Sequence, residues 1–73
     1  MFTHGYLLKT DADFHNAILF RIVVSVTQEG VHIGSGLILS QSYHVVKMIE
    51  GFYFKYSCDF TVCSMESVKN LKL

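Results

Sequence analysis

A chain of 73 residues, 51% of them hydrophobic and only 16% charged, has room for one small domain with a marginal core of its own. Six basic and six acidic residues give a formal net charge of zero, which argues against a protein that binds nucleic acid through a basic surface. More apolar residues are present than so small a core can hide. We therefore expect part of the surface to be covered by a second chain, as in a homo-oligomer.

The features of a secreted or membrane-bound protein are missing from the pattern. The start of the chain lacks the basic, apolar and small-residue order of a secretory signal. The longest apolar run, residues 17–24, is broken by Arg21 and is far shorter than the ~20 residues of a spanning helix. Two cysteines do not make a disulfide framework. These observations predict a cytoplasmic protein with reduced thiols and no membrane partner.

A short helix is predicted near residues 11–17. Thr10 is a good N-cap residue, and Asp11 and Asp13 place negative charge in the first helical turn. Phe14 and Ala17 then follow at helical spacing. Residues 6–8, before the helix, are a candidate for an additional edge strand.

The rest of the chain alternates apolar and polar residues with a period of two, which is typical of strands that are buried on one face. Residues 18–27 carry their apolar side chains at even positions, and residues 31–39 at odd positions. In residues 52–62 the even positions are expected to face the core and the odd positions to face outward. The expected inward set is Phe52, Phe54, Tyr56, Cys58, Phe60 and Val62.

Short strands separated by tight polar turns predict an antiparallel meander. Residues 64–73 fit either a last helical turn or a fifth strand. A meander of five short strands is expected to curl, because an open sheet leaves vulnerable edges. The predicted fold is therefore mainly β, or α+β, with a small five-stranded antiparallel curled sheet or barrel of the SH3-like or Sm-like kind.

No stretch carries a catalytic, metal or cofactor motif. Cys58 and Cys63 fall on opposite faces of a continuous strand and about 16 Å apart, beyond the reach of a disulfide or a shared metal ion. Gly34 and Gly36 form a G-x-G inside a strand, with no helix following, so they predict a bend or a close backbone approach and not a phosphate site. We expect neither an enzyme nor a metal or cofactor.

The most informative stretch for binding is the aromatic segment of residues 52–56. With Tyr53 and Lys55 expected on the outer face, it could anchor a protein interface or stack nucleobases. The candidate partner-binding residues are Tyr43, His44, Tyr53 and Lys55. Because the net charge is zero, we favour a protein-binding module, a small regulator or inhibitor that occludes a larger protein, over a small barrel that binds single-stranded RNA or DNA.

Residues 24–48 resemble the first half of the Sm-like family, with an apolar strand, a glycine turn and Gly36 before Leu37 and Ile38. The resemblance covers about a third of the chain and implies a small β fold. The RNA-contacting Asp and Asn of that family would fall near Ser42 and Val45, where neither is present. The family's second Arg-Gly motif has no counterpart after Val62 either, so the resemblance implies no function.

Overall fold

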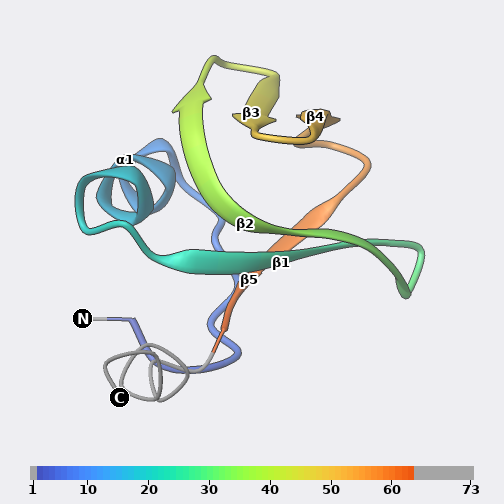
Figure 1. Cartoon of the computed structure of the whole chain (residues 1–73), viewed down its shortest axis with the longest axis horizontal. Helices are drawn as coiled ribbons and strands as arrows, with labels where there is room; N and C mark the ends of the chain where they lie inside the picture. The colour runs from blue at the N-terminus through green and yellow to red at the C-terminus, as the bar shows by residue number, and fades with distance from the viewer. Residues whose placement is uncertain (1, 64–73) are drawn as a thin grey trace.

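The computed structural model describes residues 2–63, which form one helix followed by a single five-stranded antiparallel sheet (Figure 1). The predicted alternatives for residues 64–73 lie outside the described residues. In chain order the elements are α1 (Asp11–Leu19), β1 (Val23–Gln28), β2 (Val31–Gln41), β3 (Val45–Met48), β4 (Gly51–Phe54) and β5 (Asp59–Val62). The strand order is β4-β3-β2-β1-β5, so the sheet is curled but stays open instead of closing into a barrel. The mainly β, five-stranded prediction is confirmed.

Helix α1 begins where the sequence predicts it. The Thr10 hydroxyl accepts a hydrogen bond from the Asp13 amide at 3.0 Å, and the Asp13 carboxylate accepts one from the Thr10 amide at 3.2 Å. This capping box satisfies two amides that have no partner within the helix. The helix continues to Leu19, two residues beyond its predicted end, and Arg21 at a φ of 54° turns the chain into β1. Among residues 2–63 no helix is long and apolar enough to cross a membrane.

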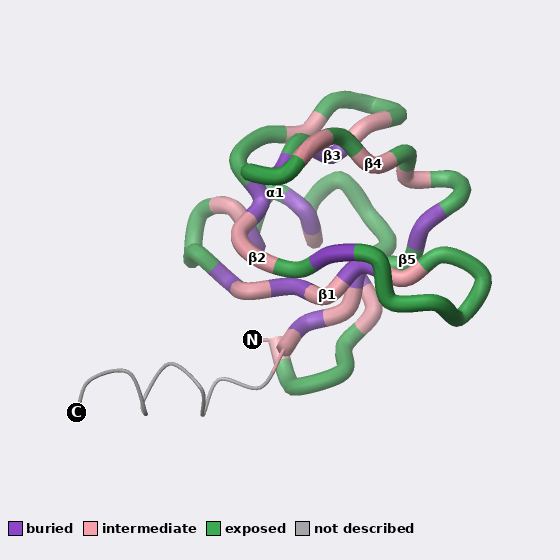
Figure 2. Tube along the Cα trace, turned by 45° about the vertical axis from the view of Figure 1, so that its right-hand side comes forward, coloured by how far each residue is buried: buried purple, intermediate pink, exposed green. Residues whose placement is uncertain are grey.

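The core lies between α1 and the concave side of the curled sheet (Figure 2). The rings of Phe14 on α1 and Phe60 on β5 meet edge to face at 5.3 Å. The even positions of β1 point inward, as predicted. The buried apolar residues are Leu8, Phe14, Ala17, Ile22, Val24, Val26, Ile38, Val46, Met48, Cys58, Phe60 and Val62.

Strand β2 faces the opposite way from its prediction. Antiparallel partners share a face, so Gly34 and Gly36, paired with the buried Val26 and Val24, lie on the inward face. A Cβ at Gly34 would overlap the hydroxyl of Tyr53, which occupies the space that the missing side chain leaves. The two glycines therefore let β2 bend and bring the β3–β4 hairpin over the core. The odd-numbered Val31, Ile33 and Leu39, predicted to be buried, are exposed.

The predicted single strand over residues 52–62 is broken in two. The amides of Ser57 and Cys58 donate to the carbonyl of Phe54 at 3.3 and 3.2 Å, which closes a turn between β4 and β5. After this turn Cys58, Phe60 and Val62 are buried, as predicted. Before it the prediction is wrong, because Phe52, Phe54 and Tyr56 are exposed.

The two edges of the sheet differ. The outer side of β5 is covered by the N-terminal segment: Gly5 donates to Val62 at 2.7 Å, Val62 to Tyr6 at 2.9 Å and Leu8 to Phe60 at 2.9 Å, around a Leu7–Thr61 bridge. Residues 6–8, predicted as a candidate for an additional edge strand, lie at this edge but form only the isolated bridge and not a strand of the sheet. The opposite edge is β4, beyond which the described part of the chain places no further strand.

Candidate protein interface

Two of the four predicted partner-binding residues lie on the surface. Tyr43 and His44 occupy the turn between β2 and β3, and both are exposed. Their rings contact each other edge to face at 4.6 Å. The His44 carbonyl accepts a hydrogen bond from the Lys55 amide at 2.8 Å. Tyr43 and His44 therefore lie at the end of the β3–β4 hairpin where the chain leaves β4.

The other two, Tyr53 and Lys55, turn inward and not outward as predicted. Tyr53 is half-buried, and its ring packs edge to face on Phe60 at 6.4 Å and against the backbone of Gly34. The two residues share a face because they are two positions apart along the chain. Tyr53 and Lys55 thus lie on the inward side of this segment, and Phe52 and Phe54 lie on its outward side.

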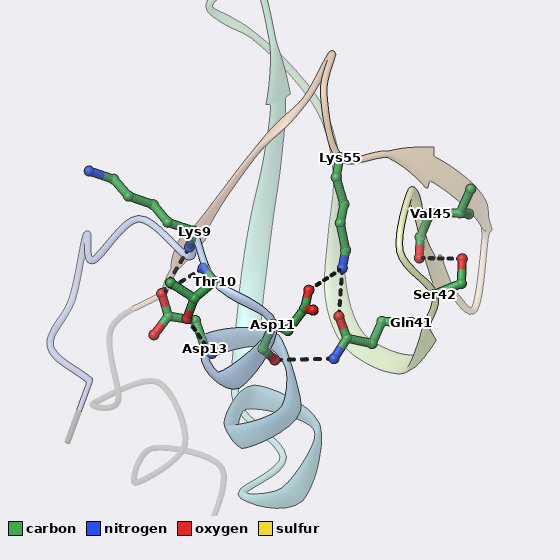
Figure 3. A network of polar contacts seen from close by, with 8 residues as sticks. All are labelled: Lys9, Thr10, Asp11, Asp13, Gln41, Ser42, Val45 and Lys55. Atoms are coloured by element: carbon green, nitrogen blue, oxygen red, sulfur yellow. Dashed lines mark hydrogen bonds and ion pairs between the residues drawn. The ribbon is translucent and has the colours of Figure 1, made fainter.

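The Lys55 ammonium holds the start of the helix against the end of β2 (Figure 3). Its Nζ donates to Gln41 Oε1 at 2.6 Å and lies 3.5 Å from Asp11 Oδ1. It also lies 4.6 Å from the centre of the Phe14 ring, in cation–π contact. The Gln41 amide group completes the network by donating to the Asp11 carbonyl at 3.2 Å. Because the Lys55 side chain is only 15% exposed and already has these partners, it is not free to neutralise a phosphate.

The exposed rings of Phe52, Phe54 and Tyr56 form what we call the aromatic patch. The Phe54 and Tyr56 rings lie 5.8 Å apart. On β3, Lys47 pairs with Phe52 and places its Nζ 5.6 Å from the centre of that ring. The alternation in the sequence identifies these aromatics as one set, but no local signal shows that this set faces outward.

Within residues 2–63, no other segment pairs with the outer side of the β4 main chain beside the patch. The hydrogen bond from Lys55 to His44 fixes the alternation of the β3–β4 ladder, so Tyr53 and Gly51 direct their backbone groups to β3. Phe52 and Phe54 direct theirs to the outer edge. The Phe54 carbonyl is engaged by the turn to β5, which leaves the Phe52 amide, the Phe52 carbonyl and the Phe54 amide directed away from β3.

A shallow depression of about 190 Å³ adjoins the aromatic patch between the end of β2 and β3. Ser40 and Ser42 bring hydroxyl groups to it, and Phe52 and Val45 bring apolar surface. The described residues that line it are Ser40, Gln41, Ser42, Val45, Lys47 and Phe52. The surface next to the open edge therefore offers both an apolar anchor point and polar groups, as protein interfaces do.

A larger cleft of about 530 Å³ lies between the N-terminal segment and α1. Its one carboxylate, Asp13, accepts hydrogen bonds from the amides of Lys9 and Thr10 and from the Tyr6 hydroxyl. These hydrogen bonds, and the one from the Lys9 amide most of all, hold the pKa of Asp13 below its usual value. Desolvation and the bond to Asp13 raise the pKa of Tyr6. This carboxylate is thus committed to capping the helix, and no other charged side chain among the described residues lines the cleft.

In the described part of the chain the cysteines form no disulfide and the histidines join no metal site. Cys58 is buried and Cys63 half-buried, and both are free thiols. Across residues 2–63 no three side chains of the His, Cys, Asp and Glu types gather in a way that could hold a metal ion.

No protein-family model, curated protein or solved structure matches this chain.

Proposed function

We propose that the chain is a non-catalytic protein-binding module, a small regulator or inhibitor that acts by occluding a larger partner. One observation supports this above the others: among residues 2–63, no strand pairs with the outer edge of β4, which lies next to exposed aromatic rings. Natural proteins usually protect such edges with charge, proline or a covering segment. This chain covers β5 in that way and leaves β4 open with phenylalanines. Its site of action is the cytoplasm, where free thiols such as those of Cys58 and Cys63 persist.

The proposed partner offers a segment in extended conformation that adds to the sheet beside β4. Its main chain bonds to the Phe52 amide and carbonyl and to the Phe54 amide, which supplies affinity. Its side chains pack on the aromatic patch, where large rings act as anchors at the centre of an interface. Tyr43 and His44, exposed in the turn before β3, lie near enough to extend this surface.

The proposal is tested by capturing partners from the native cell with tagged chain as bait. The test variant is Phe52→Ser/Phe54→Ser, and the matched control is Val31→Ser/Ile33→Ser, which removes exposed apolar side chains from the β1–β2 hairpin instead. A partner retained by the wild type and the control but lost by the test variant is the expected result. Equal retention by all three chains would contradict the proposal.

One observation favours nucleic acid as a second candidate: Lys47 lies beside the exposed ring of Phe52, a pairing that can stack a base and contact its phosphate. The zero net charge and the engagement of Lys55 weigh against it. Binding of a single-stranded oligonucleotide at ~50 mM salt, weakened by added salt and by Phe52→Ser, would replace the protein partner with nucleic acid.

A further inference from the structure

The open edge and the closed edge of the sheet restrict how copies of this chain can associate. Head-to-tail addition through the sheet needs two free edges on each copy, since β4 of one copy must meet β5 of the next. Here the N-terminal residues 5–8 already bond to the outer side of β5. The outer edge of β4, which no described residue of the chain covers, can pair only with another free edge, and a second copy offers one that is identical.

We infer that two copies pair β4 with β4, antiparallel across a two-fold axis, and so join their sheets into one. This inference rests on the open edge used in the proposed function and names a second copy as the occupant of that edge. Such an interface is isologous, because the same patch is used on both subunits, and it closes at the dimer. A partner of the proposed kind would have to displace the second copy.

The free backbone groups select the register of this pairing. With Phe52 on the axis, the Phe52 amide of each copy donates to the Phe52 carbonyl of the other. The Phe54 amide then faces Glu50 in the turn of the other copy. Shifting the centre to Tyr53 would direct the Phe52 amide at the Phe54 carbonyl, which already accepts hydrogen bonds from two backbone amides and the Ser57 hydroxyl in the turn to β5. The register centred on Phe52 leaves fewer groups in conflict.

The side chains and charges are compatible with this register. Phe52 is 66%, Phe54 52% and Tyr56 80% exposed. At about 200 Å² for a whole aromatic residue, these rings expose on the order of 400 Å² per copy, roughly half of what a stable interface buries on each partner. The two Lys47 residues would lie on the strands flanking the β4 pair, about 14 Å apart and beyond the screening length of physiological salt. The net charge of zero adds no repulsion.

The first test measures the mass of the untagged chain by light scattering from ~1 µM to ~500 µM, since an interface of this size is expected to be weak. We expect a monomer that becomes a dimer as concentration rises. Phe52→Pro removes the edge-facing amide without removing a bond to β3, and an edge strand tolerates that change. Phe52→Val keeps the amide and is the control. The proline variant is expected to dimerise at least about tenfold more weakly than the valine variant.

The second test fixes the register by oxidation, in a chain whose Cys58 and Cys63 are replaced by Ala. Phe52→Cys places two thiols across the axis, with Cα atoms about 5.5 Å apart, within disulfide reach. Phe54→Cys is the matched control, because its two copies would be offset by four residues, about 13 Å along the strands. Covalent dimer from the first variant and little from the second supports the register. Equal or reversed yields overturn it.

The outcomes separate this inference from the proposed function. A strict monomer at all concentrations, or a dimer that Phe52→Pro and Phe52→Val affect equally, overturns the β4 pairing. Circular dichroism of each variant shows whether it is folded, and the wild-type measurement stands in any case. Partner capture that does not depend on the aromatic patch, in a chain that still dimerises through β4, overturns the proposed function alone.

Discussion

The phenol ring of Tyr53 on β4 lies against the backbone of Gly34 on β2, in space that any other residue at position 34 would fill. A Cβ added there would overlap the Tyr53 hydroxyl and come within 3.1 Å of Cζ. This contact decides which face of β4 points inward. With Tyr53 held over the bend of β2, its neighbours Phe52 and Phe54 must point outward and form the aromatic patch.

We expect Gly34→Ala to destabilise the fold by about 1–3 kcal/mol, because the new methyl group forces the ring of Tyr53 out of its place. Tyr53→Phe removes the nearest atom and is expected to cost less than about 1 kcal/mol. In the double variant part of the loss should be recovered, so the two changes couple. Urea unfolding of all four chains measures the coupling, and strictly additive effects would show that the contact does not matter.

The second prediction concerns the stability that the contacts of Lys55 contribute. Its ammonium group bonds to Gln41 and Asp11 and lies over the Phe14 ring, whereas Lys47 contacts only an exposed ring. We expect Lys55→Ala to lower the free energy of unfolding by about 1–3 kcal/mol. Lys47→Ala should change it by no more than about 0.5 kcal/mol. Thermal or chemical denaturation compares them, and similar losses would contradict the role given to Lys55.

The helix and β1 could be predicted because their signals are local. A capping threonine with an aspartate three residues later specifies the start of α1, and the alternation before Thr27 specifies the inward face of β1. The orientation of β4 could not be predicted in the same way. In β1 the polar residues mark the outer face, but in β4 both faces carry aromatic residues, so alternation does not decide which face is buried. The choice depends on Gly34, nineteen residues before Tyr53 in the chain.

The same alternation of residues gives no sign of the turn between β4 and β5. Phe52 and Phe60 are both even-numbered aromatics in one unbroken alternation, yet one is exposed and the other almost fully buried. The residues of the turn, at positions 55–57, include no glycine or proline to mark it. The sequence therefore predicts the wrong orientation for Tyr53 and Lys55, which lie on the inward side and not on the outer face.

Two substitutions test that Phe52 points outward and Phe60 points inward. Phe52→Ser removes an exposed ring, and we expect it to change the free energy of unfolding of the monomer by no more than about 1 kcal/mol. Phe60→Ser removes the ring that packs on both Phe14 and Tyr53 and buries a hydroxyl in its place. It is expected to cost at least about 3 kcal/mol and to leave little folded chain. Comparable losses for the two variants at low concentration would contradict the orientation of β4.

The last prediction concerns the stability of the fold at acidic pH. In the folded chain the Asp13 carboxylate accepts hydrogen bonds from the Lys9 and Thr10 amides and from the Tyr6 hydroxyl, and its pKa is lowered. A lowered pKa in the folded state means that this carboxylate contributes stability above its unfolded pKa, near 4, and that the contribution is lost as the pH falls through the folded value. The free energy of unfolding of the wild type should therefore fall as the pH drops below about 4.

Asp13→Asn should be less stable at neutral pH and lose less on acidification, because the neutral amide keeps only part of the capping. Asp59→Asn, which changes an exposed aspartate of β5, is the control and should follow the wild type. Circular dichroism during urea titrations at several pH values measures the slopes. If Asp13→Asn lost stability in acid as steeply as the wild type, the acid-sensitive group would have to be another carboxylate, and the cap at Thr10 would not be held by the charge of Asp13.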